Sequence, residues 1–269
     1  MSMPANLVLV RHGESEGNIA IARSKMGDHG AYTDEFKNRH SSLWRLSLKG
    51  RKQAAMTGEW MHDELGLTFD RHYTSAYLRA METAGLLDIE RAMWYTDFNL
   101  RERDWGELDR VSVEERDKSF SDAMEKREID SFYWTPPNGE SLAQLCLRID
   151  RVFQTLHREC SGKNVLIVCH GEVMWAARVI LERLSQPRFH ELDKSKNPKD
   201  RMHNCQVLHY SRIDPDRSDG TLGPYLNRMR SICPWDMKRS RNEWQQIVRP
   251  SYSNQQLMEL VDKHPPIVQ

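Results

Sequence analysis

The sequence predicts an α/β protein, a three-layer sandwich with a mainly parallel central sheet flanked by helices on both faces. Short apolar runs at Asn6–Val10 and Val165–Val168 are typical of strands whose two faces are both buried. The second run is followed by a turn and then by apolar residues at helical spacing, and the alternation of strand and helix that recurs along the chain indicates a parallel sheet. Ligands of such sheets bind beyond the carboxyl ends of the strands.

Three elements are expected after the first apolar run, within the first third of the chain. Apolar residues recur every three or four positions over 49–65 and predict an amphipathic helix. Residues 69–74 predict a strand, and residues 77–87 predict a second helix with Ser75 as a candidate cap. Strand, turn and helix therefore repeat in this part of the chain.

The strongest helix signal lies over 142–156, where apolar side chains repeat on one face and Ser141 precedes them as a candidate cap. The breaker Ser161-Gly162-Lys163 ends this pattern before the second apolar run. A helix is predicted over 174–184, and a further strand over 204–211. The second half of the chain thus repeats the alternation of the first.

Periodicity weakens in the C-terminal part of the chain, which is mostly polar. A strand within 225–232 and a helix within 255–261 are the elements expected there. We therefore expect one domain over 1–269, with a core of about 5–213 and a C-terminal extension of about 214–269 packed on it.

Composition excludes several classes of protein. Lys plus Arg and Asp plus Glu are each 39, so no overall charge draws the chain to nucleic acid or to an anionic membrane, and neither partner is expected. The five cysteines form no Cys-x-x-Cys pair, which argues against a disulfide framework and a zinc site. The N-terminus lacks a signal-peptide pattern, and no apolar stretch approaches the roughly 18 residues of a membrane span. We expect a cytoplasmic protein, with its oligomeric state left open.

One short segment after the first strand carries chemistry. Arg11-His12-Gly13-Glu14-Ser15, followed by Asn18, sets a cation and an imidazole at a strand end. Taken singly, the arginine could be a surface charge, the histidine a core residue and the glycine a turn. Four specified residues in a row arise by chance in roughly one chain in a thousand. The group as a whole therefore indicates a functional site.

With these residues the chain resembles the histidine phosphatase superfamily, also called the phosphoglycerate mutase-like superfamily, and specifically its branch 1. It lacks the second arginine and the proline that mark the phytase and acid-phosphatase branch. The resemblance covers about residues 5–185. Further stretches similar to those of the family occur in order at Leu46–Ala54, Thr74–Ala84, Leu100–Gly106, Asn138–Ser141 and Val168–Glu172.

The resemblance implies a site for phosphoryl transfer, which requires fixed cations and hydrogen-bond donors around the phosphate oxygens. Arg11 and Arg79 would bind these oxygens, with Asn18 as a neutral donor. His12 would attack phosphorus through a neutral ring nitrogen, provided that a backbone carbonyl or similar acceptor holds the proton on the other one. The product of this attack is a phosphohistidine.

His170 would stabilise the transition state from the second strand end, and the Gly171 amide at a helix start would add a positive dipole. Glu102, at the family's acid position, would protonate the leaving oxygen and later deprotonate water. The partner would be a small-molecule phosphomonoester. Neither a cofactor nor a metal ion is expected, because no ligand cluster has metal-binding spacing and the arginines already offset the phosphate charge.

Two departures from the family pattern bear on specificity. Arg110 stands where the family often has a glycine, so it either places a cation near the substrate or faces solvent. The link between Asn18 and Leu46 is longer than expected for the family. It carries seven basic or imidazole side chains, namely Arg23, Lys25, His29, Lys37, Arg39, His40 and Arg45. This link is either a solvated loop or, with Arg110, a basic rim that selects a substrate with a second anionic group.

The pattern favours a phosphatase. Cofactor-dependent phosphoglycerate mutases of the family carry a long basic insertion after the acid, with an Arg-Arg pair. In this chain the segment 102–139 is short, and its charges are mixed. A mutase is the alternative. A non-catalytic interaction module is a third reading, weakened because every catalytic position is filled. A bifunctional kinase–phosphatase is excluded, because no Gly-x-x-x-x-Gly-Lys-Ser/Thr loop occurs.

Overall fold

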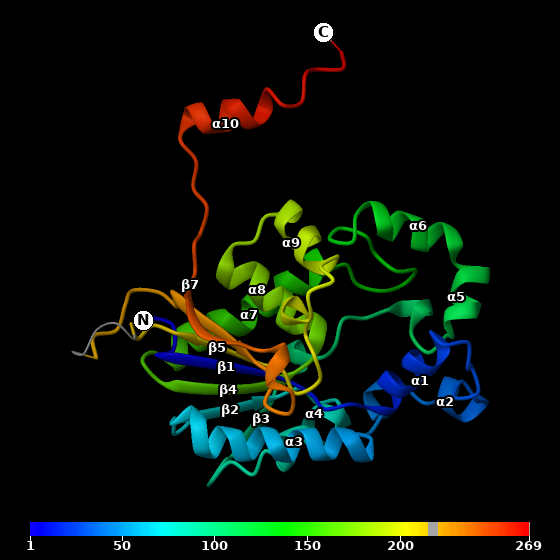
Figure 1. Cartoon of the computed structure of the whole chain (residues 1–269), viewed down its shortest axis with the longest axis horizontal. Coiled ribbons are helices and arrows are strands. Elements are labelled where there is room, and N and C mark those ends of the chain that lie inside the picture. The colour runs from blue at the N-terminus through cyan, green and yellow to red at the C-terminus, as the bar shows by residue number, and fades with distance from the viewer. Residues whose placement is uncertain (215–219, 269) are drawn as a thin grey trace.

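The fold is that of a computed structural model, which describes residues 1–214 and 220–268. A seven-stranded sheet runs through its centre in the order β3-β2-β4-β1-β5-β6-β7 (Figure 1). Strands β1 to β4 are mutually parallel, and β5, β6 and β7 are each antiparallel to the preceding neighbour. The strands are β1 Asn6–Arg11, β2 Arg71–Thr74, β3 Trp94–Thr96, β4 Asn164–Cys169, β5 Val207–Ser211, β6 Arg228–Ile232 and β7 Arg241–Gln246. The predicted α/β class with its mainly parallel core is confirmed.

Helices cover both faces of the sheet, which explains why β1 and β4 are apolar throughout. Successive side chains of a strand point to opposite faces. Leu7 and Leu9 accordingly belong to one core cluster, whereas Val8 and Val10 belong to the other. Helices α7 (Leu142–Glu159) and α8 (Gly171–Glu182) cover the first face, and α3 (Leu48–Trp60) and α4 (Leu78–Leu86) cover the second (Figure 1).

The caps of two helices test the predicted starts. Ser141 caps α7 and forms a capping box with Gln144, as expected. Ser75 does not cap α4, because the cap position is Tyr77. The Ser75 hydroxyl accepts the Tyr77 N–H at 3.3 Å and lies 2.8 Å from a ring nitrogen of His170, so it belongs to the site described below. The predicted helix over 49–65 is α3, which ends in one π-helical turn.

A group of short, polar helices that the sequence did not predict lies beyond the carboxyl ends of β1 and β4, on the right of Figure 1. These helices are α1 Glu16–Ser24, α2 Asp34–Asn38, α5 Val113–Ser119 and α6 Ser121–Ile129; α9 Gln186–Asp193 lies near α8. Single 3-10 turns connect the larger elements at Ser41–Leu43, Phe98–Leu100, Gly106–Leu108, Pro198–Asp200 and Met237–Arg239. Most of the short helices bury little surface, so their sequences lack a clear apolar face.

The C-terminal extension has two parts. Strands β6 and β7 continue the sheet, whereas every described residue from Ser251 onwards is exposed, including α10 (Asn254–Val261). Figure 1 shows α10 standing away from the sheet at the end of an extended segment. We expected the whole extension to pack on the core, and this expectation is wrong for α10. Helical periodicity predicts that a helix forms but not which surface the helix contacts. Among the described helices, none has the length and apolar character needed to cross a membrane.

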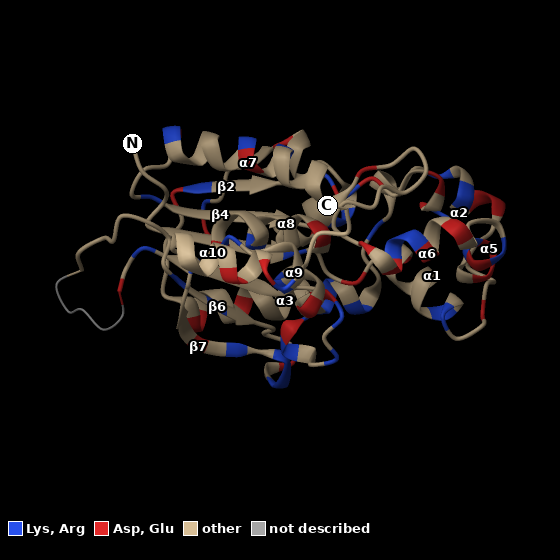
Figure 2. Cartoon of the chain, turned by 90° about the horizontal axis from the view of Figure 1, so that it is seen from above, with Lys and Arg blue, Asp and Glu red and all other residues tan. Residues whose placement is uncertain are grey.

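Figure 2 shows basic and acidic residues interspersed along the helices and loops. This distribution agrees with the balanced composition, in which basic and acidic residues are equal in number. Any concentration of positive charge is therefore local, and the one at the carboxyl ends of the parallel strands matters most for the site.

Candidate active site

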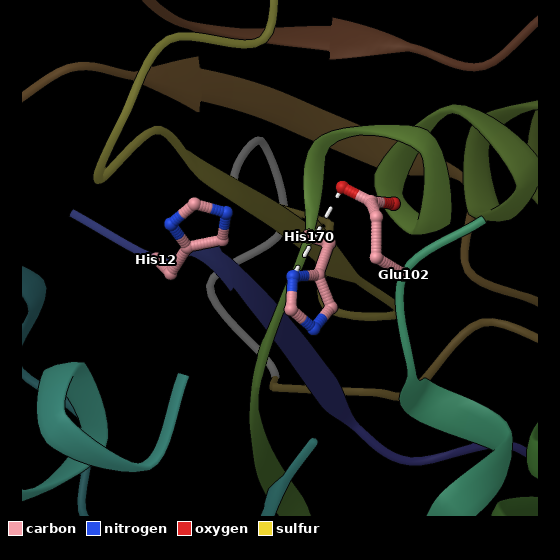
Figure 3. A group of neighbouring side chains, drawn as sticks. All are labelled: His12, Glu102 and His170. Carbon is pink, nitrogen blue, oxygen red and sulfur yellow. Dashed lines mark ion pairs between the residues drawn. The ribbon is translucent and has the colours of Figure 1, made fainter. Parts of the chain in front are cut away.

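Three separate segments bring His12, His170 and Glu102 together. Residues 12 and 170 follow β1 and β4, which are adjacent and parallel, so both histidines leave the same sheet edge. Their ring centroids are 5.1 Å apart. Glu102 approaches from the loop after β3, and its Oε2 lies 4.0 Å from Nδ1 of His170 (Figure 3). Residues far apart in sequence thus meet where α/β sheets bind ligands.

The ring of His12 is held in the orientation that a nucleophile needs. Its Nδ1 lies 2.7 Å from the carbonyl oxygen of Gly13, an acceptor that fixes the ring proton on Nδ1. The lone pair of Nε2 is then available, and it accepts a 3.2 Å hydrogen bond from Nε of Arg79. Burial, and next the charge of Arg79, hold the pKa of His12 well below its usual value. His12 is therefore neutral at physiological pH.

Two buried arginines flank this ring. Arg79 donates from Nη1 to the carbonyl oxygen of Ser41 at 2.6 Å, and Arg11 donates from Nη1 to the carbonyl oxygen of Met202. The Nε group of Arg11 is buried and has no hydrogen-bond partner within the described residues. An unpaired buried donor is costly, so this N–H is well placed to bind an oxygen of a ligand.

His170 is fully buried at the start of α8. Its Nε2 lies 2.8 Å from the Ser75 hydroxyl, and the ring packs edge-on against Tyr77 at 5.2 Å between centroids. A hydroxyl that donates to Nε2 places the proton of the neutral ring on Nδ1, which has no partner within the described residues. Burial, followed by the charge of Arg79, lowers the pKa of His170 strongly. The following Gly171 begins α8 and packs against the Arg11 side chain.

Glu102 has the electrostatic character of an acid. Its pKa is raised to about 7, first by burial and next by the Glu172 carboxylate, while Arg79 opposes the rise. The carboxyl group is only partly exposed, at 18% of its side-chain surface. A carboxyl group with this pKa holds a proton in part of the population at neutral pH and can release it.

The loop that carries Glu102 is fixed by a buried ion pair. Glu140 accepts two hydrogen bonds from Arg148, at 2.7 and 2.8 Å. Arg148 in turn donates to the backbone carbonyl of Glu102 at 3.1 Å. Glu140 thus helps to position the loop that carries Glu102, a role that the sequence did not assign to it, whereas Ser141 is the predicted helix cap.

Hydrogen bonds to Ser15 and Asn204 connect Asn18 to the site. Its Oδ1 accepts from the backbone N–H of Ser15 at 3.2 Å and from Nδ2 of Asn204 at 2.9 Å. Asn204 also donates to the carbonyl oxygen of His12 at 3.1 Å. These contacts engage the oxygen of Asn18 and leave its amide nitrogen as the donor that a ligand would meet. Spacing along the chain could not reveal the contribution of Asn204, because 186 residues separate it from Asn18.

A cavity of about 800 Å³ opens over this cluster. The predicted residues Arg11, His12, Asn18, Arg79, Glu102, Gly171 and Arg110 all line it, and His170 lies buried beside them. Aromatic side chains form much of the remaining wall, namely Tyr32, Phe36, Trp44, Tyr77, Trp105 and Trp175. The volume lies in the upper range of sites that enclose a drug-sized molecule, so the cavity has room for far more than a phosphate group.

Arg110 lies in the cavity wall and has a left-handed backbone, with φ of 68°. This conformation favours glycine, which explains the family preference at this position. The Arg110 side chain donates to the carbonyl oxygen of Lys37 at 2.9 Å and so connects its loop to α2.

The predicted basic rim is only partly present. Of the basic side chains between Asn18 and Leu46, Lys25 and His40 line the cavity. Arg23 instead pairs with Asp28 at 2.6 Å, and Arg39 pairs with Glu35 at 2.5 Å. These two arginines are exposed and neutralised outside the cavity wall, so they do not form the rim that the sequence suggested.

His12, Glu102 and His170 also meet a geometric condition for metal binding, since one donor atom of each lies within 4.8 Å of the others. The surroundings of these three donor atoms differ from those of a usual metal site. Two guanidinium groups, those of Arg11 and Arg79, lie beside it, and a cation there would be repelled. The donor set therefore fits an anionic ligand better than a divalent cation.

Comparison with known proteins identifies relatives of this site. The family model described as histidine phosphatase superfamily (branch 1) matches residues 7–199. A 2,3-bisphosphoglycerate-dependent phosphoglycerate mutase of Azorhizobium caulinodans is 32% identical over 188 residues, which are 66% of this chain and 82% of the mutase. The human 6-phosphofructo-2-kinase/fructose-2,6-bisphosphatase 1 is 28% identical over 171 residues, 64% of this chain but only 31% of that enzyme.

Solved structures share the fold. The alpha-ribazole phosphatase from Shigella flexneri has a TM-score of 0.60 and 19% identity, covering 82% of this chain and 96% of that one. A mycobacterial glucosyl-3-phosphoglycerate phosphatase has a TM-score of 0.58 and 22% identity, covering 77% and 89%. At these identities the likeness concerns the fold alone.

Proposed function

The chain belongs to the histidine phosphatase superfamily (branch 1), and from this membership and the site geometry we propose that it hydrolyses small phosphomonoesters through a phosphohistidine at His12. One observation carries the proposal. The Gly13 carbonyl holds the proton of Nδ1, so that Nε2 of a neutral ring faces two guanidinium groups. A nucleophile set among fixed cations suits an electrophile that carries negative charge.

In the first step the lone pair of His12 Nε2 attacks phosphorus and forms a P–N bond, while the P–O bond to the leaving group breaks. Glu102 donates its proton to the leaving oxygen, which departs as an alcohol. Arg11 and Arg79 bind the equatorial oxygens, with Asn18 and the Gly171 N–H as further donors. His170 donates to the same phosphoryl group through Nδ1.

In the second step a water molecule attacks phosphorus from the side that the alcohol has left. The Glu102 carboxylate takes one proton from this water, the P–N bond breaks and its electron pair returns to Nε2. Inorganic phosphate forms, and both His12 and Glu102 regain their starting protonation states. The arginines supply the positive charge throughout, so we propose that the reaction requires neither a metal ion nor a cofactor.

A mutase is the second candidate, because relatives at 29–32% identity include several phosphoglycerate mutases. It would use the same nucleophile and differ in the acceptor of the phosphoryl group. The volume of the cavity, about 800 Å³, favours water as acceptor, since space remains beside a small substrate. The five free cysteines, four of them buried, suit a reducing compartment, and we propose a cytoplasmic location.

Product analysis distinguishes these functions. The wild-type protein and the variant His12→Ala are incubated with 4-nitrophenyl phosphate and with a panel of phosphorylated metabolites, and released phosphate is measured. Hydrolysis predicts phosphate release by the wild type alone. Interconversion of monophosphoglycerates that outpaces phosphate release would favour the mutase, and equal rates for wild type and variant would contradict both activities.

A further inference from the structure

The cavity wall formed by α5 and α6 carries a second pair of arginines. Arg116 belongs to α5 and Arg127 to α6, and both line the same cavity as His12. The mechanism proposed above uses neither of them. In Figure 1, α5 lies next to α1 and α2, and α6 lies above α5, both away from the sheet that carries the histidines. The pair therefore belongs to a part of the cavity wall that does not come from the strands carrying the histidines.

Tryptophan rings hold this pair in place. The guanidinium carbon of Arg127 is 5.4 Å from the ring centroid of Trp105 and 5.8 Å from that of Trp134. The guanidinium carbon of Arg116 is 5.8 Å from the Trp105 centroid. Such stacking fixes the plane of a guanidinium group and leaves its N–H edge to bind acceptors. Few side-chain rotamers remain to be restricted when a ligand binds.

Arg116 donates from Nη2 to the carbonyl oxygen of Leu108 at 3.5 Å, but each of the two arginines keeps a buried donor atom without an acceptor. The Nε groups of Arg116 and Arg127 are buried and have no hydrogen-bond partner in residues 1–214 and 220–268. Neither side chain forms an ion pair within the same described ranges. Their neighbour Arg103, stacked on the same two rings, differs: it donates to the carbonyl oxygens of Glu140 and Trp134 at 2.7 and 3.0 Å.

The charges of this wall are incompletely balanced. Burial lowers the pKa of Arg116, and the positive charge of Arg127 lowers it further. Asp109 and Asp117 act in the opposite direction, but neither lies within the 4.0 Å of an ion pair to Arg116 among the described contacts. Two neighbouring cations with buried, unpaired donors are stabilised by an anion that accepts from both.

We propose that Arg116 and Arg127 form a second anion subsite, and that the substrate is a phosphomonoester bearing a second anionic group, a carboxylate or another phosphate, on an organic spacer. The inference deepens the proposed function, because it presumes that the first phosphate binds at His12. Tyr32, Phe36 and Trp44 line the same cavity and offer apolar contact to the spacer. The subsite replaces the rim of Arg23 and Arg39, which are paired outside the cavity.

Titration calorimetry tests the subsite without requiring turnover. The probes are alkylphosphonates with three to six methylene groups, each compared with the ω-carboxy and ω-phosphono compounds of the same length. The series is needed because the spacer length is unknown, and the two end groups distinguish a carboxylate from a phosphate. The wild type should bind at least one ω-anionic probe about tenfold or more tightly than its alkyl counterpart, as two charge-assisted contacts imply.

The decisive variant is Arg116→Gln with Arg127→Gln, and its matched control is Arg23→Gln with Arg39→Gln. Both double variants remove two positive charges, but only the first pair lies in the cavity wall. The ratio of the two dissociation constants should fall to near one in the first variant and stay at the wild-type value in the control. A circular-dichroism melt verifies that each variant is folded, and the variant Arg127→Lys, which keeps the charge, provides an intermediate ratio if the double variant does not fold.

Equal affinity of the wild type for all alkyl and ω-anionic pairs would overturn the subsite, as would a preference that survives in Arg116→Gln with Arg127→Gln. A preference lost equally in the control would show long-range charge attraction in place of a site, and would also overturn it. Failure of the proposed hydrolase function is distinguishable, because it shows as absent phosphate release by the wild type while the calorimetric ratio is measured independently.

Discussion

At the scale of single residues, the pKa values of two neighbouring groups shift in the opposite directions that their two proposed roles require. Burial next to Arg79 keeps His12 neutral, which a nucleophile requires, and burial next to Glu172 keeps Glu102 partly protonated, which an acid requires. The same desolvated site thus produces a base and an acid. Groups whose pKa values move apart in this way are typical of catalytic pairs.

The acid role of Glu102 predicts a pH dependence. Its pKa of about 7 means that the proton needed by a poor leaving group is lost as pH rises through about 7, so kcat/KM for alkyl phosphates should fall above that pH. Aryl phosphates, whose leaving oxygen needs little protonation, should lose less. The variant Glu102→Gln should lose about 10² to 10⁴ in rate on alkyl phosphates. Rates measured on both substrate types from pH 5 to 9 test this; equal losses on both would mean that the carboxylate is only structural.

The raised pKa of Glu102 also predicts that the variant Glu102→Gln is more stable than the wild type at high pH. The folded-state pKa of Glu102 is above its ordinary value of 4.5, so the folded state binds more protons than the unfolded state between about pH 4.5 and 7, and its stability falls across that window. Glu102→Gln should therefore be more stable than the wild type at pH 8, by at most about 3 kcal/mol, and nearly equal to it at pH 4.5. Thermal melts at the two pH values measure the difference. A variant less stable at both would refute the assigned desolvation.

Charge around the site predicts the response to metal ions. Since Arg11 and Arg79 lie beside the donor atoms of His12, Glu102 and His170, a divalent cation should bind weakly there and a phosphate ion should bind well. Activity should be unchanged after dialysis against a chelator. Loss of activity that only a divalent ion restores would assign the three side chains to a metal.

At the scale of elements, two close backbone contacts place the catalytic loop. A Cβ atom on Gly50, in the first turn of α3, would lie 2.0 Å from the backbone oxygen of Glu14, and one on Gly13 would lie 2.4 Å from that of Gly50. These distances are too short for any side chain. The glycines of two separate motifs are therefore needed together, because they let α3 pack directly against the segment after His12.

This contact predicts the effect of a matched pair of substitutions. Gly50→Ala should destabilise the protein by roughly 1–3 kcal/mol and lower kcat, because the backbone that carries His12 must move. Gly85→Ala in α4 should be neutral or slightly stabilising, since a Cβ there meets no atom within 4 Å and alanine favours a helix. Denaturant melts compare the two variants. Equal stability of both would contradict the contact.

The elements also show what the sequence could and could not predict. The strands over Asn6–Arg11 and Asn164–Cys169 and the helix α7 were predictable. Most of their side chains on the buried faces are apolar, so the sequence pattern is clear. Seven of the predicted site residues also line the cavity. The short helices α5 and α6 were not predictable, since they have no buried residue and hence no apolar stripe.

Contacts between distant segments were also hidden from the sequence. The Ser41 carbonyl that holds Arg79, and the Asn204 amide that holds the backbone of His12, are defined only by the folded arrangement. The error at Ser75 has the same origin: serine before a helix is a common cap, but here its hydroxyl faces His170 across the sheet edge. Local rules fail where a side chain serves the site.

At the scale of the whole molecule, the parallel strands of the sheet carry the candidate site, and the antiparallel strands stabilise the fold. The parallel strands β1 and β4 bring the histidines to one edge, whereas the antiparallel strands β5 to β7 widen the sheet and shield β1 from solvent. The segment after β7 differs from the sheet in its exposure to solvent. Its described residues from Ser251 onwards are all exposed, so it adds little to the stability of the fold.

Truncation tests this division. A chain that ends at Pro250 should keep the melting temperature and turnover of the full chain, because every removed residue that the structure describes is exposed. A chain that ends at Arg239 loses β7, which pairs with β6, and should melt at a clearly lower temperature. Loss of stability or activity on removal of residues 251–269 alone would show that this segment supports the core.

The central claim, covalent transfer through His12, is tested most directly by trapping the intermediate. Wild-type protein is mixed with a ³²P-labelled aryl phosphate and quenched within milliseconds in alkali, and the labelled peptide is sequenced. We predict a phosphoenzyme that is stable in base and labile in acid, with the label on His12 and none in His12→Ala. Label of full stoichiometry in His12→Ala, or turnover by that variant at the wild-type rate, would contradict the mechanism.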